Sequence, residues 1–65
     1  IAEVQSLYES SDIELTKNLI SKYNVSLIFI GNLERQKYPN LNEEKFEEIG
    51  KAIYSNGQTR IYKIN

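Results

Sequence analysis

Glu34 and Arg35 are the neighbouring charged residues best placed for chemistry, because they closely follow an apolar run in the stretch LIFIGNLERQKYPN. They lie just past Gly31, and Tyr38 and Pro39 follow. Ligand sites in α/β folds favour the region beyond the carboxyl ends of strands, where Arg35 would hold an anion or sugar hydroxyl and Glu34 would orient it. In the alternative interpretation, Glu34 caps backbone amides of the turn and Arg35 pairs with a nearby carboxylate. Both stay open, and the predicted binding residues are Glu34, Arg35 and Tyr38.

The five tyrosines also have two interpretations. Aromatic rings with a polar tip suit carbohydrate faces or a membrane interface. A very small core also needs large side chains, and tyrosine fills it while its hydroxyl reaches water. The residues concerned are Tyr8, Tyr23, Tyr38, Tyr54 and Tyr62.

The segment EEKFEE carries four glutamates in six residues. Calcium loops alternate their ligands and include a glycine turn, which this segment lacks. Its helical spacing favours a solvated helix face, and we predict no metal site.

The triplet NVS at Asn24 matches the acceptor pattern for N-glycosylation. It lies at the end of a predicted helix and before a predicted buried strand. This position predicts limited access to its serine.

Composition excludes several classes of protein. The 65 residues form one domain at most, near the lower limit for a self-supporting core. Without cysteine or histidine, disulfides, the usual zinc sites and histidine-based catalysis are excluded. A net charge of −1 argues against a nucleic-acid surface. No nucleophile–base pair, phosphate-binding glycine loop or pair of catalytic carboxylates is evident, so we expect no cofactor and no independent catalysis.

The chain begins with Ile1, contains no methionine and has no apolar run long enough to cross a bilayer. We therefore expect a soluble domain, residues 1–65, that is cut from a larger protein.

Helical signals appear in the first third of the chain. Ser11 and Glu14 match a capping box, which predicts a helix over about 12–23. Asn24 is then a candidate left-handed residue at its end. A shorter helix with a frayed beginning is predicted within residues 1–9. The apolar stripe of the longer helix is formed by Ile13, Thr16, Leu19, Ile20 and Tyr23.

The run VSLIFI predicts a strand over about 25–30 that is covered on both faces, or nearly so, because it is almost continuously apolar. Gly31 ends the strand. The segment NLERQKYPN, residues 32–40, which includes Leu33 and Pro39, is predicted as a loop or a single helical turn.

A second, short helix is predicted over about 42–49, with Asn42 as its cap and Leu41 packed against Phe46. A hairpin is predicted over about 51–64, because Asn56-Gly57 between β-prone runs is typical of a type I′ turn. This turn would pair Ser55 with Gln58, Tyr54 with Thr59 and Ala52 with Ile61. Together the elements predict a small α+β fold: a three-stranded mixed sheet with the hairpin beside the apolar strand, and helix 12–23 packed across it.

Several segments carry a family resemblance: LYESSD, KNLISKYNVSLIFIGNLERQKYP, KF and AIYSNGQTRIYKI. Together they resemble the soluble C-terminal segment of the YYY family of polytopic membrane proteins of archaea and Chloroflexi, which is related to membrane glycosyltransferases of the GT-C type. The most specific part is the apolar strand followed by Gly31, Leu33-Glu34-Arg35 and Tyr38. Asn24 and Asn32 stand where the family pattern has glycine and proline, and neither change threatens the fold.

The resemblance implies an accessory domain, itself non-catalytic, on the extracytoplasmic side of a membrane-embedded glycosyltransferase-like protein. The implied partners are the membrane-embedded remainder of that protein and a glycan or lipid-linked sugar. The alternative is a protein-interaction module that binds loops of its parent, or another partner, through its sheet face or edge. Weak self-association is a further expectation.

Overall fold

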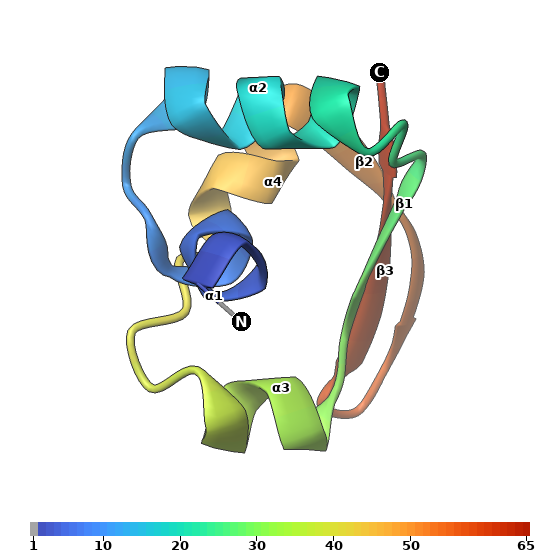
Figure 1. Cartoon of the computed structure of the whole chain (residues 1–65). Helices are drawn as coiled ribbons and strands as arrows, with labels where there is room; N and C mark the ends of the chain where they lie inside the picture. The colour runs from blue at the N-terminus through green and yellow to red at the C-terminus, as the bar shows by residue number, and fades with distance from the viewer. Residues whose placement is uncertain (1) are drawn as a thin grey trace.

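The computed structural model describes residues 2–65 and contains four helices and a three-stranded sheet. All four helices lie on one side of the sheet (Figure 1). Ile1, the first residue of the range 1–9 in which a short helix was predicted, lies outside the described residues. In chain order the elements are α1 (Ala2–Glu9), α2 (Ile13–Lys22), β1 (Leu27–Ile30), α3 (Asn32–Lys37), α4 (Glu44–Ile49), β2 (Gly50–Asn56) and β3 (Thr59–Ile64).

The sheet confirms the predicted α+β fold and the hairpin beside the apolar strand, with strand order β1-β3-β2. Its strand directions differ from the prediction of a mixed sheet, because both pairs are antiparallel. The reason is that β3, and not β2, lies next to β1. After β1, the segment with α3 and α4 brings the chain back, so that β2 runs in the same direction as β1. The hairpin then places β3 between these two strands and antiparallel to each.

The two-residue turn of the hairpin lies one residue later in the chain than predicted, so Ser55 pairs with Arg60 and not with Gln58. Asn56 pairs with Thr59, so the two loop residues are Gly57 and Gln58. Only Gly57 has a positive φ, 60°, as in a type II′ turn, in which glycine takes the first central position. The predicted type I′ turn was wrong because Asn56 completes β2 and does not enter the left-handed region. A bulge between Ala52 and Tyr54 then adjusts the pairing.

α2 begins at Ile13, one residue later than predicted. Asp12, and not Ser11, is the N-cap, and its carboxylate accepts a hydrogen bond from the backbone N–H of Leu15 at 3.1 Å. Asn24 has the predicted left-handed conformation, with a φ of 54°. Tyr23 was assigned to the apolar stripe but is exposed, because the helix ends before it and its hydroxyl bonds to Glu3 on α1.

α3 is a helix of six residues where a loop or one turn was predicted. α4 falls within the predicted range, but Asn42 does not cap it. The N-cap is Glu43, which has helical backbone angles and no capping side-chain bond. Asn42 instead donates its backbone N–H to the carbonyl oxygen of Tyr8 at 3.0 Å, which ties this segment to α1.

The core lies between the sheet and the helices. Its largest members are Phe46 from α4 and Tyr62 from β3, both fully buried. The aliphatic part comes from α2, β1 and α4: Ile20, Ile28, Ile30 and Ile49, with Leu7, Tyr8 and Leu41 packed against the cluster. Within residues 2–65, no helix has the length and apolar character needed to cross a bilayer.

Candidate functional site

Glu34 closes the beginning of α3. Its Oε1 accepts a hydrogen bond at 2.8 Å from the backbone N–H of Gly31, the N-cap residue. A Cβ at Gly31 would lie 3.1 Å from the ring of Phe29 and 3.3 Å from Glu34 Oε1, so a side chain at this position would crowd both. Glu34 therefore caps a backbone amide of the turn, as the structural interpretation of this residue predicted.

Arg35 joins α3 to two distant segments. Its Nε donates to the carbonyl oxygen of Gln58 in the hairpin turn at 2.9 Å, and its Nη1 lies 2.9 Å from Glu43 Oε1. Glu43 Oε2 in turn accepts from the hydroxyl of Tyr62 at 2.8 Å and lies 3.4 Å from Arg60. Arg35 therefore pairs with a nearby carboxylate, as the structural interpretation predicted.

The environment of Glu43 keeps it ionised. Burial alone raises the pKa of its carboxyl group, but hydrogen bonds from Arg35 and Tyr62 and the charges of Arg35 and Arg60 outweigh that effect. The pKa of Glu43 consequently lies below its ordinary value. Sequence reasoning did not single out Glu43, because its partners come from α3 and from the distant strand β3.

Tyr38 faces the interior. Its ring stacks on Tyr8, with the two centroids 4.8 Å apart, and only 7% of the residue is exposed. Tyr38 therefore does not form an open site with Glu34 and Arg35. Of the other motif positions, Leu33 and Pro39 are exposed. A binding role for Glu34 and Arg35 stays a prediction, and the contacts that they make are structural.

Lys45 is a buried charge that the sequence interpretation missed. The residue is 2% exposed, and its Nζ donates to the carbonyl oxygen of Ser10 at 2.6 Å, which ties α4 to the α1–α2 connection. Burial lowers the pKa of Lys45 to about 8. There was little sign of this burial in the sequence, because a lysine beside Phe46 in a short helix is normally expected on the solvent-exposed face.

Tyr38 and Tyr62 are buried, as expected of core-filling tyrosines, whereas Tyr23 and Tyr54 are exposed. The glutamates of EEKFEE are mostly solvated, and no cluster of three metal-binding side chains occurs among residues 2–65. In the glycosylation triplet, both Asn24 and Ser26 are exposed, so the expectation of limited access to the serine was wrong. The strand begins only at Leu27, so Ser26 precedes it, although its carbonyl oxygen accepts a hydrogen bond from the backbone N–H of Ile64 at 2.9 Å.

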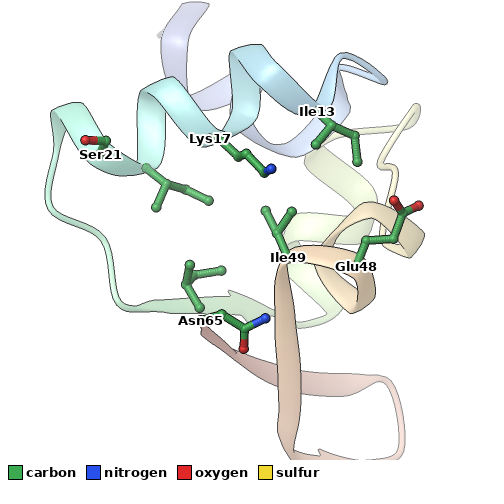
Figure 2. A pocket seen from close by; sticks show the side chains of 8 residues that line it. Ile13, Lys17, Ser21, Glu48, Ile49 and Asn65 are labelled. Carbon is green, nitrogen blue, oxygen red and sulfur yellow. The ribbon is translucent and has the colours of Figure 1, made fainter.

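A hollow of about 440 Å³ lies between α2, α4 and the end of β3. Figure 2 shows Lys17 on α2 and Glu48 and Ile49 on α4 around it. Its volume is near the lower end of small-molecule sites, which span about 300–1,000 Å³. It is distant in sequence from the Gly31–Pro39 motif and shares no residue with it. Its lining comprises Ile13, Lys17, Ile20, Ser21, Glu48, Ile49, Ile64 and Asn65.

β1 is covered on one face only, which corrects the prediction of a strand buried on both. Ile28 and Ile30 are 2% and 0% exposed, whereas Leu27 and Phe29 are 53% and 50% exposed. The reason is that all the helices pack on the same side of the sheet (Figure 1). The continuous apolar run thus supplies a second apolar face that nothing in residues 2–65 covers.

This uncovered face extends across all three strands, and we call it the outer face. Phe29 pairs with Ile61 and Ile61 with Tyr54, and cross-strand partners share a face. Ile53, at the bulge, is exposed beside Tyr54. The register assigns these residues to the outer face: Leu27, Phe29, Lys51, Tyr54, Asn56, Thr59, Ile61 and Lys63.

The outer face combines an apolar centre with a basic end. Lys63 pairs with Leu27 on one side and with Lys51 on the other, so one row carries two exposed lysines. In the part of the chain that the structure describes, neither lysine forms an ion pair. Contiguous exposed apolar surface rimmed by charge is typical of protein interaction sites.

No model of a known protein family matches the chain, and comparisons with curated proteins and with solved structures found no similar protein. The outer face is therefore the candidate site that its own geometry supports best.

Proposed function

We propose that the chain is a non-catalytic interaction domain that packs the outer face of its sheet against another polypeptide surface. The observation that carries the proposal is the half-exposed state of Leu27 and Phe29 in a strand whose sequence is that of a strand buried on both sides. A partner on this face would complete a three-layer arrangement, with helices on one side and the partner on the other.

The small size of the outer face favours a partner that is held nearby. Three strands of about six residues cover roughly 300 Å² in projection, whereas standard interfaces bury about 800 Å² per partner. Such a contact is stable when covalent linkage or a second contact raises the effective concentration. The best occupant is therefore another part of the same polypeptide or a permanent neighbour, such as the loops of a parent protein.

The resemblance to the soluble segment of the YYY family supports a context for this domain. In that context the domain lies on the extracytoplasmic side of a membrane-embedded, glycosyltransferase-like protein and helps to shape its glycan or lipid-linked sugar site. The exposed Asn24-Val25-Ser26 triplet is compatible with an extracytoplasmic position. Within this domain, the contacts of Arg35 with Gln58 and Glu43 support a structural role for Arg35.

Hydroxyl-radical footprinting tests the interaction proposal directly. The modification rates of Phe29 and Tyr54 are measured in the purified chain and inside the cells that make the protein. We expect strong protection of both rings in cells, because the partner covers them. Leu33, which is exposed on α3 and lies off the sheet, is the internal control and should react equally in both samples. Equal reactivity of Phe29 and Tyr54 in both samples would overturn the proposal.

A further inference from the structure

The two lysines of the outer face identify the chemistry of its partner. Lys51 and Lys63 lie directly opposite each other on β2 and β3, in the row that continues to Leu27. Like charges at directly opposite positions of an antiparallel pair destabilise the sheet. Both side chains are exposed and without an ion pair among the described residues.

A partner that covers the outer face would increase the repulsion between Lys51 and Lys63 unless it supplies negative charge beside them. A surface that buries Phe29 and Ile61 removes water from the adjoining row, and an ammonium group that loses water needs an opposite charge. We infer that the outer face binds a polypeptide segment that carries an apolar stripe for Phe29 and Ile61 and at least two carboxylates for Lys51 and Lys63. This inference rests on the proposed interaction function and specifies the partner.

A second copy of the chain does not meet this requirement. The residues that the register assigns to the outer face include no aspartate or glutamate. If two copies pack with a twofold axis along the strands, four lysines meet at one end. If the axis runs across the strands, the lysines face the end that carries Asn56 and Thr59, which are neutral. Neither arrangement provides a counter-charge.

A lipid surface fits less well than a polypeptide. Anionic headgroups would neutralise the lysines, but β1 and β2 are the two edges of an open sheet. Each edge strand has backbone groups that no strand of the sheet pairs, and such groups are costly in hydrocarbon. A polypeptide leaves these edges in water or bonds to them, so the geometry favours a protein partner.

The test is site-specific photo-crosslinking in the full-length protein, in the cells that make it. Phe29 is replaced by p-benzoylphenylalanine, and crosslinked peptides are sequenced by mass spectrometry. We expect a polypeptide segment with an apolar stripe and two or more carboxylates. The double variant Lys51→Glu, Lys63→Glu should lower the crosslinking yield at least fivefold, and replacing the partner carboxylates with lysine should restore it. Lys37→Glu is the matched control, because Lys37 is exposed on α3 and has no ion pair within residues 2–65.

The outcomes separate the inference from the function on which it rests. A crosslinked polypeptide without carboxylates, or a yield that the double variant leaves unchanged, overturns the inference and leaves the interaction function standing. Crosslinks to a second copy overturn the inference and replace the proposed partner with self-association. Crosslinks to lipid alone, or to nothing, overturn both.

Discussion

The guanidinium group of Arg35 lies 2.9 Å from a carboxylate oxygen of Glu43, and this ion pair joins the segment after the apolar strand to the start of α4. Arg35 also bonds to the hairpin turn at Gln58, so one side chain connects three parts of the chain. With side-chain exposures of 29% and 18%, the pair is more sheltered than an ordinary surface ion pair.

Replacing Arg35 with alanine should therefore lower the stability of the chain. Glu43 would keep its contacts with Tyr62 and Arg60 but lose its ion pair with Arg35. The carbonyl oxygen of Gln58 would lose the hydrogen bond that it accepts from Arg35. We expect a loss of about 1–2 kcal/mol in the free energy of unfolding. The measurement is urea denaturation followed by circular dichroism.

Lys17→Ala is the control for this prediction, because the Lys17–Glu14 pair is exposed and its charged atoms are 4.0 Å apart. That variant should change stability by less than about 0.5 kcal/mol. Equal effects of the two substitutions would contradict a structural role for Arg35.

The buried Lys45 should make the chain more stable in mildly alkaline solution. Burial lowers its folded-state pKa from 10.5 to about 8, so between these values the unfolded state binds more protons than the folded state. The free energy of unfolding therefore rises with pH, by roughly 1 kcal/mol per pH unit near pH 9 and about 3 kcal/mol in total. Denaturation between pH 7.5 and 9.5 measures this slope while the tyrosines of the unfolded chain stay largely neutral.

Lys45→Met removes the titrating group and keeps an apolar stem of similar length. Its stability should be nearly independent of pH over the same interval, whatever its absolute value. A flat profile for the unsubstituted chain, or an equal slope in both proteins, would contradict the burial of a charged lysine at this position.

The two faces of β1 should respond differently to truncation. Ile28→Ala removes a buried side chain of the core and should cost about 2–4 kcal/mol. Leu27→Ala removes a half-exposed side chain of the outer face and should cost less than about 1 kcal/mol in the purified chain. Thermal denaturation of both variants compares them, and similar losses would mean that Leu27 is covered in the isolated chain.

Gly57→Ala should isolate the backbone requirement of the hairpin. A Cβ at Gly57 would meet no atom within 4 Å, so only the positive φ of 60° opposes a side chain. We expect a loss of about 1 kcal/mol, measured by chemical denaturation. Gln58→Ala, at the neighbouring loop position, should be close to neutral, and a neutral Gly57→Ala would argue against the left-handed turn.

In the Gly31–Pro39 segment, the contacts between near neighbours could be predicted from the sequence, and the contacts with distant residues could not. The sequence predicted that the strand ends at Gly31 and offered capping by Glu34 as one interpretation, because both depend on residues within three positions of each other. It could not identify Glu43 as the partner of Arg35, since eight residues and a change of direction separate them. For the same reason the sequence did not predict the hydrogen bond from Lys45 to the carbonyl oxygen of Ser10, because the two residues are 35 positions apart.

In the hairpin, the sequence predicted the presence of a turn but not its exact position. The sequence located the turn at Asn56-Gly57, but a shift of one residue changed the turn type and moved each paired side chain to a new neighbour. In the observed register Tyr62 is fully buried and donates its hydroxyl to Glu43 at the start of α4, a contact that the turn residues do not specify.

The sequence by itself determined the element types outside α3, the end of the apolar strand and the left-handed residue at Asn24, because these depend on interactions within a few residues. Tertiary structure alone decided that β3 lies between β1 and β2, that Lys45 is buried and that every helix covers the same face of the sheet. Each of these depends on which distant surfaces meet. An apolar strand indicates that both faces are suited to burial, but only the packing of the whole chain shows which of them is left uncovered.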